Sequence, residues 1–237
     1  MATSHPIALI FAAVFSMAFL PSLTLAQELR VSPVSFEIAA PGATSNLTLR
    51  NQGNSTITVQ TRVVAWSQNG GEQLTSSRDV VVSPPITQLA PGATQTVRIV
   101  RTTKNAVRGE ESYRVLVDEL PDQSLNRGGT VSFVTRLRLP VFFVQRGATL
   151  PSVSWRVVQQ GNQSWLEANN SGQVHLKLAD LSLRSGNGVV FRQNGLVGYV
   201  LGGSTMRWPL GRSVGGGQLS LSAKSSVGPY SAAVAQR

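Results

Sequence analysis

The chain contains no cysteine among its 237 residues, and it has two histidines, His5 and His175. The lack of cysteine excludes a disulfide scaffold, a cysteine-ligated zinc site, an iron–sulfur cluster and a cysteine nucleophile. Having two histidines also removes most metal sites and most serine–histidine catalytic arrangements. The composition therefore favours a protein that is not an enzyme and that holds no metal or cofactor.

Charged residues make up only 14% of the chain, yet the formal net charge is +10. Lys104, Lys177 and Lys224 are the three lysines among 21 basic residues, and the others are arginines. The planar guanidinium of arginine suits bidentate pairing with a carboxylate or phosphate. Because the arginines are dispersed through strand-like segments, we interpret them as an aid to solubility or a match to an acidic partner, and not as a nucleic-acid site.

The longest apolar run lies at the N-terminus, from Ile7 to Leu20, and is followed by Pro21 and a small residue at Ala26. This pattern predicts a secretory signal peptide over residues 1–26 that is cleaved after Ala26. The run is short for a hydrocarbon layer of about 30 Å. We expect the mature chain to be exported and not to insert into a membrane.

The mature chain alternates apolar and polar residues in short runs bounded by glycine, proline, asparagine and serine, which predicts β-strands throughout. In the first half the predicted strands are Leu29–Ile38, Ser45–Asn51, Thr56–Trp66, Asp79–Ser83, Thr94–Arg101, Ser112–Leu120 and Gly129–Gln145. Seven strands at this spacing indicate an immunoglobulin-like sandwich. Within Thr56–Trp66 the alternation changes phase between Val63 and Val64, which suggests a bulge or a strand that crosses the fold.

The composition changes near Arg146: 13 basic and 9 acidic residues lie between the cut site and Arg146, against 8 and 2 beyond it. Shorter strands follow, predicted over Ser152–Val158, Ser164–Ala168, Val174–Leu183, Gly188–Phe191, Gly198–Leu201, Gln218–Ala223 and Tyr230–Val234. We expect an all-β protein of two sandwiches, over residues 27–147 and 148–237, joined by a hinge that can hold a cleft.

A search for catalytic groups finds little. His175 lies in an alternating run, where we expect it on the solvent face. Asp118 and Glu119 are adjacent carboxylates, but neighbours in a strand point to opposite faces, so surface or salt-bridge roles are expected.

The segment Gly129–Gln145 is long and has two different faces. By alternation, one face carries Val131, Phe133, Leu137 and Leu139, and the other carries Arg136 and Arg138. Exposed apolar edge strands pair with other chains, so such a strand can be kept in order to add a strand to a partner. The alternative is a central strand whose apolar residues belong to the core.

Several motifs in this half are specific. They are Val82-Ser83-Pro84-Pro85-Ile86, Thr96-Val97-Arg98-Ile99, Tyr113-Arg114-Val115, Asp118-Glu119-Leu120-Pro121 and Val134-Thr135-Arg136-Leu137-Arg138-Leu139-Pro140. In this order they resemble the periplasmic chaperones of the chaperone–usher pilus pathway. The segments Gly198-Tyr199-Val200-Leu201 and Arg207-Trp208-Pro209-Leu210 resemble the divergent, archaic branch of that family.

The resemblance implies a boomerang of two immunoglobulin-like domains with an interdomain cleft, in the periplasm. Such a chaperone binds, folds and protects pilus subunits by donor-strand complementation and delivers them to an outer-membrane usher. Donor-strand contacts map to Gly129, Val131 and Phe133, and no cofactor is needed.

The resemblance also implies two basic residues that anchor the terminal carboxylate of the subunit. One maps to Arg138; the other belongs on the first strand, where this sequence has Pro33, so Arg114 is the candidate. Arg98 and Glu110 match positions of an interdomain ion pair.

Two alternatives stay open. A secreted adhesin or pilus subunit would also be exported and all-β, although such subunits commonly carry a disulfide. A carbohydrate-binding module would use tryptophans as stacking platforms, but buried sandwich tryptophans explain them equally well. The four tryptophans are Trp66, Trp155, Trp165 and Trp208.

Overall fold

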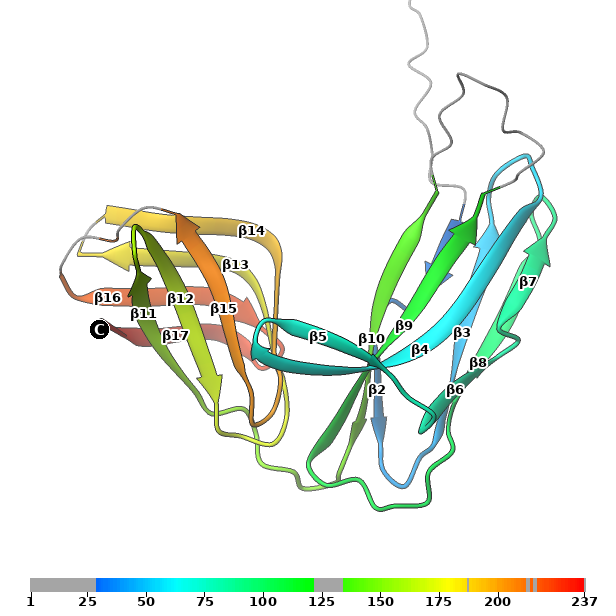
Figure 1. The fold of residues 1–237 in the computed structure, drawn as a ribbon, viewed down its shortest axis with the longest axis horizontal. Helices are drawn as coiled ribbons and strands as arrows, with labels where there is room; N and C mark the ends of the chain where they lie inside the picture. The colour runs from blue at the N-terminus through cyan, green and yellow to red at the C-terminus, as the bar shows by residue number, and fades with distance from the viewer. Residues whose placement is uncertain (1–28, 122–133, 187, 212–213, 215–216, 237) are drawn as a thin grey trace, which may run out of the picture.

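The computed structural model describes residues 29–121, 134–186, 188–211, 214 and 217–236. Every regular element in these ranges is a β-strand, and the strands form two lobes that meet at an angle, so the molecule has the shape of a boomerang (Figure 1). None of the described residues forms a helix long and apolar enough to cross a membrane. The predicted signal peptide lies outside these residues.

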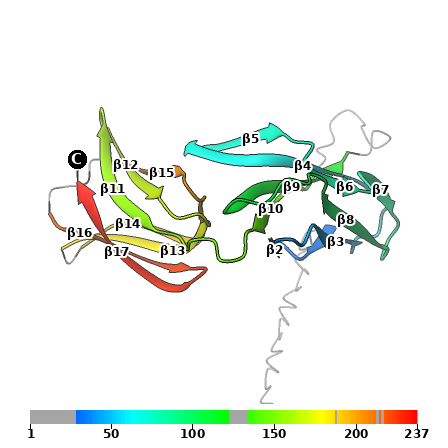
Figure 2. The ribbon, with the colours of Figure 1, turned by 90° about the horizontal axis from the view of Figure 1, so that it is seen from below.

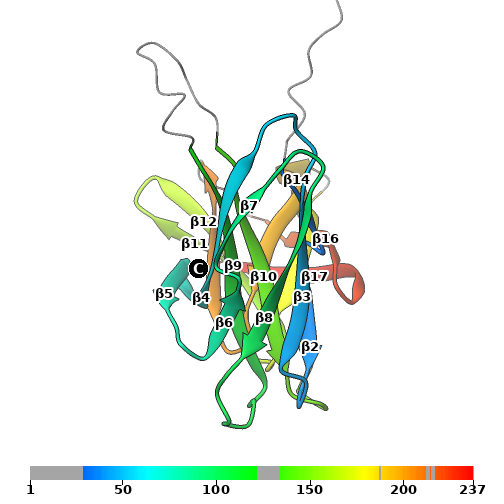
Figure 3. The same ribbon diagram turned by 90° about the vertical axis from the view of Figure 1, so that its right-hand side faces the viewer.

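The N-terminal lobe is a sandwich of two sheets. The first sheet has the order β1 (Leu29–Ser32), β3 (Thr44–Asn51), β8 (Thr94–Arg101) and β6 (Val80–Ser83). The second contains β4 (Ile57–Gly70), β5 (Glu72–Ser76), β7 (Ile86–Leu89), β9 (Glu110–Leu120), β10 (Arg136–Val144) and β2 (Phe36–Ala39). Figure 3 looks onto this lobe with β3, β7 and β8 on the near side. The inward faces share one core that includes Leu47, Val97, Val115 and Phe143.

The first predicted strand is wrong in one respect, because the segment Leu29–Ile38 forms two strands in different sheets. β1 pairs antiparallel with β3, whereas β2 pairs parallel with β10. Pro33 lies between them, and proline has no N–H with which to continue a ladder. The chain therefore crosses from one sheet to the other at this point.

The phase change within the predicted strand Thr56–Trp66 marks a strand that crosses the fold. In β4 the buried side chains are first Ile57, Val59 and Thr61, and then Trp66 and Gln68. Pairing with β9 continues through Val63 and Val64 without a bulge. The buried side chains in the first half of β4 thus point into the core of the N-terminal lobe. Those in its second half lie on the opposite face of the strand.

The C-terminal lobe is a second sandwich with a separate core. One layer contains β11 (Val153–Gln160), β12 (Gln163–Asn170) and β15 (Thr205–Gly211); the other contains β13 (Leu176–Ser185), β14 (Gly188–Val200), β16 (Leu219–Ser225) and β17 (Gly228–Gln236). Figure 2 shows these two layers edge-on. The predicted strands Gly188–Phe191 and Gly198–Leu201 correspond to the one long strand β14. The sequence did not predict β5, β7 or β15.

The two lobes contact each other through the β4–β5 hairpin. Its tip pairs in parallel with the start of β15, at Asn69 with Thr205 and Gly70 with Met206. The linker after β10 packs on the C-terminal lobe at Gly172, where a Cβ atom would lie 2.2 Å from the carbonyl oxygen of Leu150. Only glycine allows so close an approach of two backbones.

We predict that Gly172→Ala destabilises the protein by about 1–3 kcal/mol, because the added methyl group must push the linker off the lobe. Gly71→Ala is the matched control, since a Cβ there meets nothing within 4 Å. Thermal unfolding of both purified variants is the measurement. Equal melting temperatures for the two would contradict the close approach.

Candidate functional site

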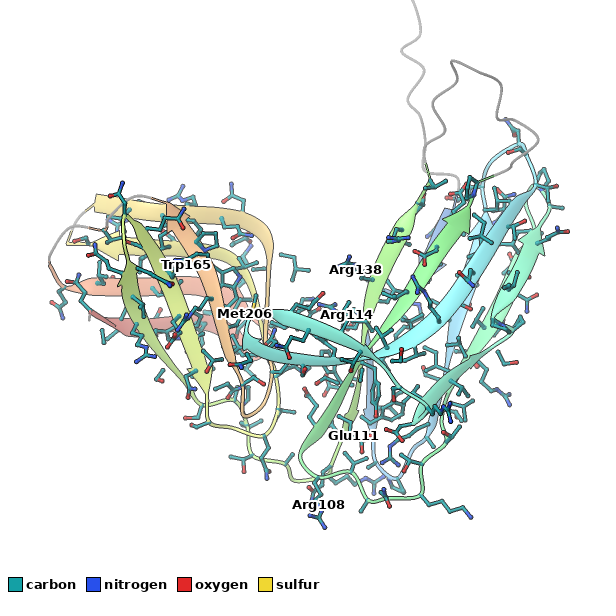
Figure 4. All side chains as sticks on the ribbon, viewed as in Figure 1. Arg108, Glu111, Arg114, Arg138, Trp165 and Met206 are labelled. Atoms are coloured by element: carbon teal, nitrogen blue, oxygen red, sulfur yellow. The ribbon has the colours of Figure 1, made fainter. Side chains whose placement is uncertain are left out.

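One face of the second sheet of the N-terminal lobe is turned away from its core and toward the C-terminal lobe. The β9–β10 register pairs Leu116 with Arg138 and Arg114 with Pro140. Side chains of directly paired residues lie on the same face, and so do alternate residues along a strand. Arg114 and Arg138 are therefore diagonal neighbours on this face, and Figure 4 shows both on the inner side of the angle between the lobes.

The guanidinium of Arg114 is almost fully buried against aromatic rings. Its Cζ lies 3.6 Å from the centroid of Trp66 and 5.5 Å from that of Tyr199. Burial lowers the pKa of Arg114 from its ordinary value, and the carboxylate of Glu72 opposes that shift. An arginine in this setting is held by cation–π attraction and by a single carboxylate.

Glu72 connects the two predicted anchors. Its Oε2 accepts a bond from Nη2 of Arg114 at 3.0 Å, and its Oε1 lies 3.4 Å from Nη1 of Arg138. The Arg138 side chain is 55% exposed, against 12% for Arg114. The structure thus brings the two arginines together at one carboxylate, one of them buried and the other accessible.

A second carboxylate organises the arginines further along the same face. Asp118 is buried and accepts bonds from Arg62 at 3.0 Å and from Arg136 at 2.6 Å. Asp118 has the salt-bridge role expected from the sequence. This part of the face thereby presents four guanidinium groups against two carboxylates, an excess of positive charge directed at the space between the lobes.

The edge of β10 beside these arginines is open. β2 pairs with β10 over Val141–Val144, whereas β9 is the one described strand that pairs with Arg136–Pro140. An open edge of this kind offers unpaired backbone groups to another chain. The predicted donor residues Gly129, Val131 and Phe133 precede it and lie outside the described residues.

Gln68 fixes the hairpin to the C-terminal lobe. Its side-chain amide donates to the carbonyl of Tyr199 at 2.9 Å and accepts from the backbone N–H of Leu201 at 2.9 Å. Trp66, Phe142, Tyr199 and Leu201 form a small apolar cluster around it. This cluster joins side chains from both lobes, and the guanidinium of Arg114 packs on its Trp66 ring.

The predicted ion pair between Arg98 and Glu110 is not formed. Arg98 is exposed on β8, in the sheet that does not face the other lobe. Glu110 instead contacts His175, with 2.7 Å between its Oε2 and the imidazole Nδ1. The backbone N–H of His175 donates to the same oxygen at 3.1 Å. Glu110 therefore does join the lobes, but its partner is a histidine.

His175 is not on a solvent face, which corrects a second expectation. Its ring stacks on Phe142 with 3.7 Å between ring centroids, and its side chain is 8% exposed. The alternation correctly directs it away from the core of the C-terminal lobe. The N-terminal lobe then covers that face, which a pattern within one lobe cannot reveal.

Sequence reasoning also missed Glu72, Trp66 and Gln68 as parts of the site. The signal for Glu72 was the Gly70-Gly71 pair, which is typical of a hairpin and would have predicted β5. The phase change in β4 was the signal for Trp66 and Gln68, since it transfers both to the face opposite the core.

A buried carboxylate in the C-terminal lobe has a structural role. Glu167 is clamped by Arg156 and by Arg207, and the Arg207 contact measures 2.6 Å. Burial raises the pKa of Glu167, but its bonds to the two arginines outweigh this and lower it overall. These groups line a polar hollow of about 600 Å³ beside the hairpin tip. Among the described residues, no group of three or more acidic, histidine or cysteine side chains is placed to hold a metal.

Comparison with known proteins finds a matching family model. The family model for pili and flagellar-assembly chaperones, PapD N-terminal domain, matches residues 28–147. No curated protein matches the chain by sequence.

Solved structures of pilus chaperones have the same two-lobed fold. One is a chain of the CsuC–CsuE chaperone–tip adhesion subunit pre-assembly complex, from archaic chaperone–usher Csu pili of Acinetobacter baumannii. It aligns with a TM-score of 0.71 and 24% identity, over 88% of this chain and 99% of that chain. The YadV chaperone aligns with a TM-score of 0.64 and 14% identity, over 87% and 100%. A chain from the Salmonella enterica SafA pilin–SafB chaperone complex aligns with a TM-score of 0.61 and 19% identity, over 86% of this chain and 95% of that chain.

We predict that Gln68→Ala loosens the angle between the lobes and lowers stability by about 1–3 kcal/mol, since it removes two buried interlobe hydrogen bonds. Small-angle scattering and thermal unfolding measure the two effects. Gln73→Ala on the exposed side of the same hairpin is the control, and we expect it to leave both unchanged. Identical scattering and melting for the two variants would show that Gln68 does not hold the lobes.

Proposed function

The chain belongs to the family of pili and flagellar-assembly chaperones that carry a PapD N-terminal domain, and from this premise we propose that it binds, folds and protects unassembled pilus subunits. The observation that carries the proposal is the pair Arg114 and Arg138, placed beside the open edge of β10. One element thus offers both a backbone edge and a basic anchor to a partner chain.

We propose that capture proceeds by donor-strand complementation. A subunit strand pairs with the free edge at Arg136–Pro140, where the described residues offer β10 no second partner. If the alternation of Leu137 and Leu139 continues toward the N-terminus, Phe133 and Val131 share their face, and Gly129 follows. Burying each such apolar side chain in a subunit contributes about 1.5–3 kcal/mol.

The arginines anchor the terminal carboxylate of the subunit. Arg138 is on the face opposite Leu137 and is accessible, so it meets the carboxylate first. The Nε of Arg114 is buried and has no hydrogen-bond partner among the described residues, so a further acceptor can reach it only if the side chain shifts. A charge-assisted bond here sets the register, because apolar side chains alone permit a slip by two residues.

We propose the remaining steps by analogy with the family. The signal peptide 1–26 delivers the chain to the periplasm, where it holds subunits until an outer-membrane usher receives them by strand exchange. No chemical reaction and no cofactor is required, because capture is binding and release is replacement of one strand by another.

The carbohydrate-binding alternative is weakened by the tryptophans. Trp66, Trp155 and Trp208 are buried in the lobe cores or between the lobes, where no sugar can stack on them. Trp165 is partly buried within β12. The pilus-subunit alternative does not account for two complete sandwiches with a basic site between them.

We predict that Val131→Asp and Phe133→Asp each abolish capture of a co-expressed pilus subunit, while the free protein stays folded. On the proposed mechanism, the bound subunit is what buries these side chains. Co-purification from periplasmic extracts measures capture, and thermal unfolding checks the fold. Val227→Asp, at an exposed valine of the C-terminal lobe, is the control. Unfolding of both test variants would assign the residues to the protein's own core and refute the donor-strand proposal.

We predict that Arg138→Glu eliminates stable complexes, whereas Arg138→Lys retains much of the binding because it keeps the charge. A merely solvated arginine would change stability by within about 0.5 kcal/mol and would leave capture intact. Arg192→Glu provides the same charge reversal on an exposed position of β14. Unchanged recovery of the subunit with Arg138→Glu would remove Arg138 as an anchor and leave Arg114 to be tested in its place.

A further inference from the structure

The two anchor arginines already share a carboxylate within this chain. Glu72 contacts Arg114 through one oxygen at 3.0 Å and Arg138 through the other at 3.4 Å. A single carboxylate that bridges two guanidinium groups has the chemistry expected of the terminus of a bound peptide. Glu72 therefore occupies the position that an arriving carboxylate requires.

Arg114 depends on this contact. It is buried over Trp66, burial lowers its pKa, and Glu72 is the one described carboxylate that bonds to it. A buried cation without a partner is strongly unfavourable. Without Glu72 the empty site would hold such a cation, so the carboxylate maintains the site in the unbound protein.

The backbone of Glu72 is fixed by strand pairing, and its side chain is partly exposed. Glu72 is the first residue of β5 and pairs with Gln68, whose amide is bonded to the other lobe. The Glu72 side chain is nevertheless 28% exposed, and its contact with Arg138 is the longer of the two. Rotation toward solvent breaks two contacts at a partly exposed group and leaves the hairpin in place.

We propose that Glu72 is an internal stand-in for the terminal carboxylate of the subunit, which pairs with both arginines in the free protein and gives way when the subunit binds. The inference rests on the proposed function, since it takes Arg114 and Arg138 as the anchor. Two guanidinium groups and one carboxylate leave a formal charge of +1. A second carboxylate is attracted to this charge but repelled by the first, so the two compete for the same donors.

The competition gives the site selectivity. Glu72 belongs to the same chain and is always present at high effective concentration, so a free small anion displaces it poorly. A subunit strand also pairs along β10 and buries apolar side chains, and this added free energy allows its carboxylate to displace Glu72. The site thus responds to a carboxylate that arrives on a strand in the correct register, and it binds carboxylates in solution only weakly.

The test uses the full mature protein and acetate as the probe. The Nε–Hε signals of Arg114 and Arg138, assigned with Arg114→Lys and Arg138→Lys, are followed by ¹⁵N NMR during titration with sodium acetate at constant ionic strength. Acetamide serves as the uncharged control. Wild type is compared with Glu72→Gln and with Glu37→Gln, which removes the same charge from an exposed position of β2.

We expect Glu72→Gln to lower the acetate concentration for half-saturation by about fivefold or more, and Glu37→Gln to match wild type. Acetate should also raise the melting temperature of Glu72→Gln more than that of wild type. If Glu72→Gln does not fold, Glu72→Asp, which keeps the charge on a shorter side chain, should give the same changes in smaller measure. Equal or weaker acetate binding in the Glu72 variant, or no acetate shift at either arginine in any variant, would overturn the proposal.

This experiment needs no subunit, so its outcome is separate from that of the proposed function. Failure of wild type to co-purify with a subunit would refute the chaperone proposal and leave the acetate result intact. Conversely, capture of the subunit by wild type together with unchanged acetate binding in Glu72→Gln would refute only the stand-in role.

Discussion

The burial of the Arg114 guanidinium against Trp66 is the interaction on which the site depends. A cation in an apolar setting needs both an aromatic face and a carboxylate, and β4 and β5 supply them from one hairpin. The hairpin in turn must be held, and Gln68 holds it by bonding to the backbone of the other lobe. The burial of this one charge therefore depends on the N-terminal sandwich, the hairpin and the C-terminal lobe together.

The long strand β4 makes this connection possible. Its first half packs into the core of the N-terminal lobe, and its second half carries Trp66 and Gln68 on the opposite face. A strand packed against one core alone would bury the same set of alternate residues along its whole length. The cost is a hairpin that extends beyond its own sandwich, and its pairing with β15 covers part of that exposed backbone.

The lobes are held by small polar and aromatic contacts and not by a common core. Each sandwich has its own apolar cluster, and a third, smaller cluster between them contains Trp66, Phe142, Tyr199 and Leu201. His175 stacks on Phe142 and bonds to Glu110 at the same junction. Such an interface fixes the angle between the lobes while it leaves the arginine face open to a partner.

Alternation in the sequence determined most of the strands, the two sandwiches, the phase change in β4 and the placement of Arg138 opposite Leu137. These are properties of one strand, which a period of two reveals directly. The tertiary structure decided which side chains meet: Glu110 with His175 and not with Arg98, and Glu72 with both arginines. Those contacts depend on the register between distant strands and on the packing of one lobe over a face of the other, and no local pattern contains either.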